Sequence, residues 1–240
     1  MLKEVVRRLG RTGVGKNVIH AAVMRDPASM RFANVTTWPG EVRGFEDLAF
    51  MFSSNQLNHG VASLQLDEAA FLFRLARDVR RGPVVEIGRF KGGSTLIMSS
   101  ALPDGVELWS YDAHVALRPD MPGSLLDAEL RGALERFGLD SKVKLLVGDS
   151  KTADPPPDPI ELLFIDGDHT YEGARSDFER WGTFVAPGGR VLFHDAVDTG
   201  GYGNVYPGVA RAVAGIGAGW DREPGAGSIA VFRKWSSPSS

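Results

Sequence analysis

Apolar and polar positions change their spacing along the chain, and this pattern predicts where helices and strands lie. Apolar residues recur at helical spacing over 66–79, where two acidic residues occupy the first turn and Arg81-Gly82-Pro83 stops the helix. Beyond this point, short apolar runs alternate with helical patterns. The predicted strands are 84–88, 106–112, 143–147, 160–165, 190–194 and 228–232. The further predicted helices are 94–102, 125–137, 171–185 and 209–216.

This alternation decides the fold class. Strands that alternate with helices form right-handed βαβ units, so we predict an α/β domain with a doubly wound, Rossmann-like, mostly parallel sheet over 66–235. Residues 1–65 form an N-terminal extension, with a basic amphipathic helix expected at 1–10, a helix at 45–52 and irregular chain elsewhere. Residues 236–240 are expected to be a disordered tail.

Composition narrows the class of protein. The 240 residues suit one large domain, and 43% hydrophobic with 24% charged residues is ordinary for a globular chain. A net charge of −3 argues against a nucleic-acid partner. The absence of cysteine excludes disulfides, thiolate metal sites and cysteine nucleophiles. No apolar run approaches the roughly 18–20 residues of a membrane span, and the N-terminus lacks a signal-peptide core, so we expect a cytoplasmic protein without a membrane partner.

Acids, glycines and histidines gather where the predicted strands end. Ligands bind at the carboxyl ends of strands in such sheets, so these are the candidate functional residues. They are Glu86, Gly88, Asp112, Gly148-Asp149-Ser150, 166–169 and His194-Asp195.

Residues 86–94 read as a strand end, a glycine-rich turn and a helix start. Gly88 and Gly92 allow the backbone to approach a ligand closely, and Ser94 is the expected N-cap. Asp112 ends the next strand, where an acid can accept hydrogen bonds from both ribose hydroxyls of a nucleoside. The pyrophosphate fingerprint G-x-G-x-x-G is absent, which favours a cofactor with ribose and adenine but no phosphate. The alternative is a tight turn beside a surface acid.

Four segments and one acid carry a resemblance to a known family. They are EIGRFKGGS at 86–94, Asp112, GDS at 148–150, FIDGDHTYEGARSDFERW at 164–181 and PGGRVLFHD at 187–195. Together they resemble class I S-adenosylmethionine (SAM) dependent methyltransferases. They are most similar to the metal-dependent small-molecule O-methyltransferases, a group that includes the macrocin, rhamnosyl and other sugar O-methyltransferases and the cephalosporin-hydroxylase-like proteins.

The resemblance covers about 66–235 and implies a seven-stranded sheet whose last strand is antiparallel. It also implies a SAM pocket, and we count Lys91 and Gly92 of the glycine-rich turn with it. The expected cofactor-binding residues are Glu86, Gly88, Lys91, Gly92, Ser94, Asp112, Asp149 and, near adenine, Ser150. In such families an N-terminal extension often forms a lid or a dimer contact, so a homodimer is the expected assembly.

A second group of acids and histidines follows two strands that should be adjacent. Neighbouring carboxylates repel one another unless they are protonated or bridged by a cation, and an oxygen-rich site suits Mg²⁺ or another divalent ion. The resemblance implies a metal held by Asp166 and by the pair His194-Asp195. Related proteins often have two acids at that pair, so whether His194 ligates the metal or supports the site stays open. The alternative for these acids is a role in helix caps and turns.

The expected reaction is methylation of a hydroxyl. An alcohol is a poor nucleophile at neutral pH, so a base must take its proton, and His169 is the predicted base. The rival candidates are His194 and a purely structural, helix-capping His169. The resemblance implies a sugar or glycan acceptor, and a phenol or catechol is the main alternative.

Three other classes of protein are alternatives to a methyltransferase. Residues 10–17 nearly match a phosphate-binding P-loop, but Asn17 stands where a hydroxyl is required and no strand precedes the motif. The broken glycine fingerprint disfavours a nicotinamide-dependent reductase on the same sheet. The third class is a SAM-binding protein without catalysis.

Overall fold

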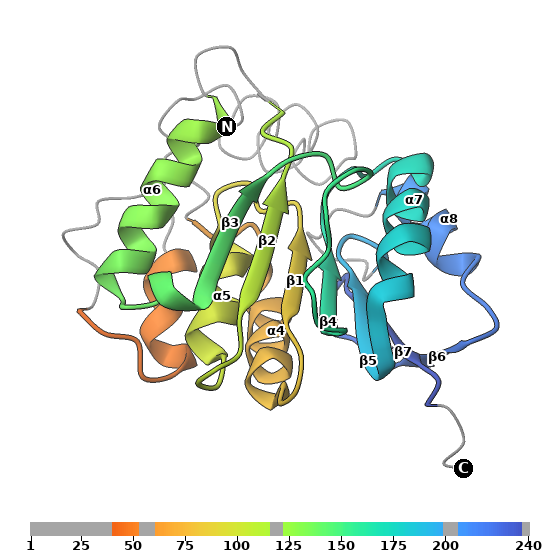
Figure 1. Ribbon diagram of the computed structural model, residues 1–240, viewed down its shortest axis with the longest axis horizontal. Helices are drawn as coiled ribbons and strands as arrows, with labels where there is room; N and C mark the ends of the chain where they lie inside the picture. Colours follow the sequence, from red (N-terminus) through yellow and green to blue (C-terminus); the bar gives the residue numbers. More distant parts are fainter. Residues whose placement is uncertain (1–39, 53–60, 116–121, 199–205, 237–240) are drawn as a thin grey trace, which may run out of the picture.

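The described residues of the computed structural model, 40–52, 61–115, 122–198 and 206–236, form one seven-stranded sheet (Figure 1). The strand order is β3-β2-β1-β4-β5-β7-β6. Strands β3 to β5 are parallel, and β7 is antiparallel to both β5 and β6. The predicted doubly wound sheet with an antiparallel last strand is confirmed. The strands are β1 Val84–Ile87, β2 Leu108–Asp112, β3 Val143–Val147, β4 Ile160–Ile165, β5 Val185–Phe193, β6 Trp220–Glu223 and β7 Ala230–Lys234.

Helices cover both faces of the sheet because side chains of each strand alternate between them. Leu162 and Phe164 of β4 pack in one core with α4, α5 and α6, whereas Leu163 and Ile165 pack in a second core with α7 and α8 (Figure 1). The α-helices are α4 Leu66–Asp78, α5 Gly93–Ala101, α6 Gly123–Arg136, α7 Tyr171–Trp181 and α8 Pro207–Ala214. The 3₁₀ helices are η2 Phe45–Phe52, η3 Asp140–Lys142 and η4 Gly182–Phe184.

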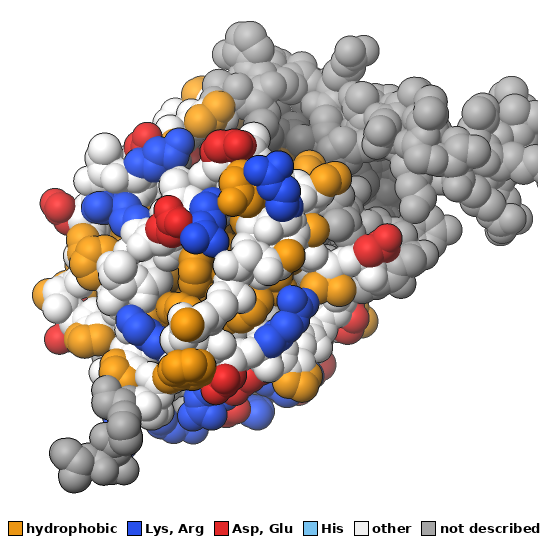
Figure 2. Space-filling model, turned by 90° about the vertical axis from the view of Figure 1, so that its right-hand side faces the viewer, with side chains coloured by type: hydrophobic (Ala, Val, Ile, Leu, Met, Phe, Trp, Pro, Cys, Tyr) orange, Lys and Arg blue, Asp and Glu red, His pale blue; other side chains and the backbone are white. Residues whose placement is uncertain are grey.

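Part of the N-terminal extension packs in the first core. Leu48 and Met51 of η2 are buried in the same cluster as α4 and α5. The helix expected at 1–10 and the tail at 237–240 lie outside the described residues. None of the helices in the described ranges is long and apolar enough to cross a bilayer. Figure 2 shows basic and acidic side chains interspersed on the described part of one face.

Two local predictions were wrong. The helix predicted over 171–185 ends at Trp181, and the strand predicted over 190–194 already begins at Val185. The strand runs through Pro187-Gly188-Gly189 because its register with β4 shifts there, as at a β-bulge. The short edge strand β6 was missed because three of its four residues are charged and leave no apolar pattern. Strands β3 and β4 have the predicted bounds.

The ends of β1 and β4 approach each other closely at Gly88. Its φ is +85°, and a Cβ at this position would lie 2.3 Å from the carbonyl oxygen of Asp166. The Gly88 N–H donates to Tyr111 on β2 (2.9 Å), and the Asp166 N–H donates to Ile87 on β1 (2.8 Å). Only glycine fits where these three strand ends meet.

Gly88→Ala should therefore destabilise the protein more than the same change at a left-handed glycine with free space around it. Gly105 is the matched control, since its φ is +81° and a Cβ there would meet nothing within 4 Å. Gly105→Ala should cost about 1–2 kcal/mol, the usual penalty of a left-handed residue. Gly88→Ala should cost about 1–3 kcal/mol more from overpacking. Urea denaturation measures both, and equal losses would contradict the close approach.

Candidate active site

Glu86 lies beneath the glycine-rich loop and is fully buried. Its carboxylate accepts hydrogen bonds from the hydroxyls of Ser94, Thr95 (2.5 Å) and Ser110 (2.6 Å). Burial raises the pKa of Glu86, although the three hydroxyls oppose this shift. Glu86 thus joins the start of α5 to β2 and supports the loop from below. Its direct contact with a cofactor stays a prediction.

The loop enters α5 through a left-handed glycine. Gly92, with φ of 79°, is the N-cap, so Ser94, the expected cap, instead lies in the first turn. A Cβ on Gly92 would lie 2.5 Å from the side chain of Leu130 on α6. Lys91 is only 2% exposed, and burial lowers its pKa to about 8. The loop is therefore tightly packed between α5 and α6.

Asp112 ends β2 opposite the loop. Its Oδ2 accepts the backbone N–H groups of Arg89 (3.0 Å) and Phe90 (3.2 Å), and its Oδ1 accepts that of His114 (2.7 Å). In the described chain, three residues other than glycine have positive φ: Phe90, His114 and Asp195. All three follow carboxyl ends of strands. Such strained conformations persist where the surrounding structure fixes them, often at functional sites.

The segment after β3 is anchored to α7. The Ser150 hydroxyl donates to Asp177 Oδ1 (2.6 Å), and the Trp181 indole N–H donates to the Ser150 carbonyl (2.9 Å). Burial raises the pKa of Asp177. Asp149 is exposed and accepts the backbone N–H of Lys151 (2.9 Å). The structure thus brings Asp149 and Ser150 to the same end of the sheet as Asp112, while the Ser150 hydroxyl itself donates to Asp177 on α7.

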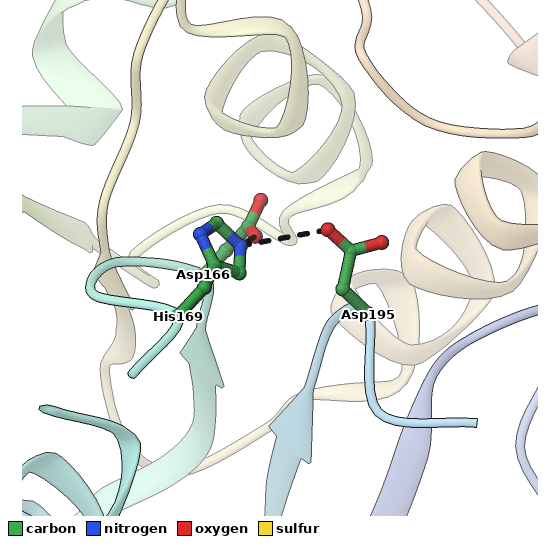
Figure 3. Close-up of side chains that lie close together, drawn as sticks. All are labelled: Asp166, His169 and Asp195. Carbon is green, nitrogen blue, oxygen red and sulfur yellow. Dashed lines mark hydrogen bonds and ion pairs between the residues drawn. The ribbon is translucent and has the colours of Figure 1, made fainter. Parts of the chain in front are cut away.

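Asp166, His169 and Asp195 face one another at the ends of β4 and β5 (Figure 3). His169 Nε2 lies 3.3 Å from Asp166 Oδ1 and 3.5 Å from Asp195 Oδ2. One donor atom of each residue lies within 4.8 Å of the others. The two strand ends predicted to be adjacent do meet, and His169 stands between their acids.

His194 lies on the buried side of this group. Its Nδ1 lies 3.1 Å from Asp166 Oδ1, and its Nε2 lies 3.2 Å from Glu68 Oε2 on α4. Glu68 is 2% exposed and also accepts the N–H and hydroxyl of Ser228, both at 2.7 Å. Both ring nitrogens of His194 are thus occupied by carboxylates. A metal-ligating His194 stays a prediction, which would require one nitrogen to leave its partner.

Opposing effects set the charges of this centre. Burial disfavours the charged form of every member, but ion pairs and hydrogen bonds outweigh burial at most of them. The pKa of His194 is raised well above its ordinary value by Asp166 and Glu68. The pKa of Asp166 is lowered to about 2, chiefly by His194 and His169. At Asp195 burial prevails and, with the nearby acids, raises the pKa to about 6.

This donor set fits a divalent cation. Two carboxylates and one imidazole from two adjacent strand ends suit Mg²⁺ or a transition metal that accepts nitrogen. Tyr206 borders the group, since its ring stacks on His169 with centroids 4.2 Å apart and its N–H donates to the Asp195 carbonyl (3.1 Å). No local pattern in the sequence marks Glu68, Ser228 or Tyr206 as part of this site, because each contacts residues of other elements.

Comparisons with known proteins show what the central part of the chain is similar to. Residues 85–196, which run from β1 to just past Asp195, match the family model described as a methyltransferase domain. The catechol O-methyltransferase of Niastella koreensis is 25% identical over 178 residues, 69% of this chain and 73% of that protein. The uncharacterized protein R132 of Acanthamoeba polyphaga mimivirus is 29% identical over 140 residues, or 56% of this chain, and the match covers 61% of the viral protein's length.

A solved structure extends the comparison to most of the fold. The O-methyltransferase TomG of Streptomyces achromogenes, involved in tomaymycin synthesis and solved in complex with SAM, aligns with a TM-score of 0.57 and 18% identity, covering 84% of this chain and 94% of that one. The chain therefore has the Rossmann-like methyltransferase fold, seven strands with an antiparallel β7. The family match and the Niastella koreensis relative support a methyltransferase as the class of enzyme.

The Glu68 carboxylate should make the stability of the protein sensitive to acid. Burial works against its ionisation, but hydrogen bonds from His194, Gln65 and Ser228 lower its pKa from 4.5 to about 2. A lowered carboxyl pKa contributes stability that is present above pH 4.5 and is lost as the pH falls toward 2. The contribution is on the order of 3 kcal/mol.

Urea denaturation at pH values from about 6 to about 3 tests this expectation, because the loss of stability begins within this range. Glu68→Gln should be less stable than wild type at neutral pH and should lose less stability on acidification. Leu72→Ala, which removes buried apolar atoms from the same helix, is the control: it should lower stability equally at every pH. A Glu68→Gln curve parallel to wild type would contradict the assignment.

Proposed function

We propose that the protein transfers a methyl group from SAM to a hydroxyl group of a small acceptor. One observation carries the proposal. The glycine-rich loop and Asp112 lie at the carboxyl ends of the strands. The group formed by Asp166, His169 and Asp195 lies at the same end of the sheet, next to the close approach of Gly88 to Asp166. A methyl donor at the first and an acceptor hydroxyl at the second would be neighbours, and methyl transfer depends chiefly on such positioning.

The proposed chemistry assigns a role to each part. When bound, SAM supplies an electrophilic methyl group, and a divalent cation would favour the ionised form of an acceptor hydroxyl. Asp166 and Asp195 would hold the cation, and His169 would take the hydroxyl proton. The stacked Tyr206 ring and the Asp166 carboxylate hold the His169 imidazole in place for this step. If Nε2 instead ligates the cation, His169 is a ligand and not the base.

The proposed acceptor is a sugar or glycan hydroxyl, a preference that rests on the motif resemblance. A catechol is the second candidate, favoured by the likeness to the catechol O-methyltransferase of Niastella koreensis. Both kinds of molecule offer neighbouring hydroxyls that one cation can bind together. The remaining partner predictions, a homodimer and the absence of nucleic-acid and membrane partners, also stay predictions.

Calorimetric binding of S-adenosylhomocysteine tests the cofactor half. Wild type should bind it, and Asp112→Asn should bind about 10–100-fold more weakly, because hydrogen bonds to a charged group are worth about 1.5–3 kcal/mol. Asp104→Asn, at an exposed acid before β2, is the matched control and should bind like wild type. A wild-type protein that binds no S-adenosylhomocysteine would contradict the proposed function.

Methyl transfer to a panel of monosaccharides, oligosaccharides and catechols tests the acceptor half. Activity should fall on addition of EDTA and return with Mg²⁺ or Mn²⁺, and Asp195→Asn should lose it. His169→Gln should lose activity but keep Mn²⁺ binding if His169 is the base, whereas loss of both makes it a ligand. Undiminished activity in EDTA would refute the metal, and transfer to catechols alone would refute the sugar acceptor.

A further inference from the structure

The Arg89 side chain forms a buried network that the proposed mechanism does not use. Arg89 follows Gly88 in the glycine-rich loop, yet its side chain is only 1% exposed. It lies within the protein, with the carboxylate of Asp127 on α6 as its counter-ion. Its Nε lies 2.7 Å from Asp127 Oδ1 and its Nη2 lies 2.6 Å from Asp127 Oδ2, a bidentate pair.

The remaining guanidinium donors link other segments. Nη1 donates to the carbonyls of Ser110 on β2 and Leu146 on β3, both at 2.9 Å. Nη2 also lies 3.1 Å from His114 Nε2, which is itself 2.9 Å from Asp127 Oδ2. Four of the five N–H groups of the guanidinium therefore donate to carbonyl or carboxylate oxygens within the protein, and the fifth faces the His114 ring. Because the Arg89 side chain is buried in these contacts, any role in binding acts through another residue.

That residue is Asp112. The backbone N–H groups of Arg89 and Phe90 donate to one oxygen of the Asp112 carboxylate, and that of His114 donates to the other. The Arg89 side chain fixes the same two segments, because it bonds to the strand that carries Asp112 and contacts the His114 ring. Phe90 and His114 keep left-handed conformations within this network, with φ of 48° and 53°.

We propose that Arg89, paired with Asp127, is a positioning residue that fixes the Asp112 carboxylate for the ribose hydroxyls of SAM. The inference rests on the proposed function. A buried ion pair is poor evidence of a stability gain, since desolvation offsets much of its attraction. Its effect here is preorganisation: a carboxylate already held in its binding orientation loses little freedom when the ligand arrives.

Calorimetric binding of S-adenosylhomocysteine to four proteins tests the inference: wild type, Arg89→Lys, Asp112→Asn and the double variant. Lysine keeps the charge but cannot make the bidentate pair and the two carbonyl bonds together. Arg89→Lys should weaken binding about tenfold or more, since one misplaced carboxylate interaction is worth at least that factor. In the Asp112→Asn background the same change should weaken binding little further, because both substitutions act on the same interaction between the Asp112 carboxylate and the ribose.

Two further variants separate this role from general destabilisation. Arg190→Lys changes a partly exposed ion pair with Glu223 (2.6 Å) between β5 and β6 and should leave affinity unchanged. Asp127→Asn is the second route if Arg89→Lys fails to fold, and it should weaken binding in the same way. With an acceptor at hand, KM for SAM should rise in both Arg89→Lys and Asp127→Asn, with kcat near wild type.

The outcomes are distinct. Wild-type affinity in both Arg89→Lys and Asp127→Asn, or effects that simply add to that of Asp112→Asn, would overturn the inference while leaving the proposed function intact. A wild-type protein that binds no S-adenosylhomocysteine would overturn both. Weak binding in Arg89→Lys, normal binding in Arg190→Lys and no further loss in the double variant would support Arg89 as a positioning residue.

Discussion

The close approach of β1 and β4 at Gly88 is the constraint on which the site at the carboxyl ends of the strands depends. The Asp166 carbonyl occupies the space where a side chain on Gly88 would lie, so the loop that follows β1 and the acids that follow β4 share one boundary. A side chain at this position would push the two strand ends apart, and with them the two halves of the site. The glycine therefore sets the distance between them as well as a local turn.

Two buried ionic networks flank this boundary. On one side Arg89 and Asp127 join the loop to α6, and on the other Glu68 and His194 join α4 to the end of β5. Each places full charges out of water, which costs free energy unless partners compensate for it. In both networks, further hydrogen bonds satisfy the polar atoms of the charged groups. The helices beside the sheet are therefore hydrogen-bonded to the strand ends as well as packed on them. Rigid support of this kind is what a site needs to hold several side chains within tenths of an ångström.

Sequence patterns predicted most of the fold, and the reason is physical. Strands buried on both faces, such as β4, are continuous apolar runs bounded by turns, and these signals are local. The same holds for the acids at strand ends, whose proximity follows from the topology once the strands are known. The features that the sequence did not predict lack a local pattern. Strand β6 carries charges because it is an edge strand, and Glu68 resembles any acid at the start of a helix. No pattern in one sequence shows that a first-turn acid will meet His194, 126 residues further on.

The bonds between Glu68 and Ser228 span 160 residues, and this separation has a consequence for the order in which this buried cluster forms during synthesis. The ribosome releases α4 and the first strands well before the segment that carries Ser228. Until that segment emerges, the Glu68 carboxylate must remain hydrated, and burying it early would leave a charge without its partners. The centre therefore assembles among the last parts of the domain, when β7 docks beside β5. A nascent chain halted before Ser228 would leave the Glu68 carboxylate without two of the hydrogen bonds that compensate for its burial.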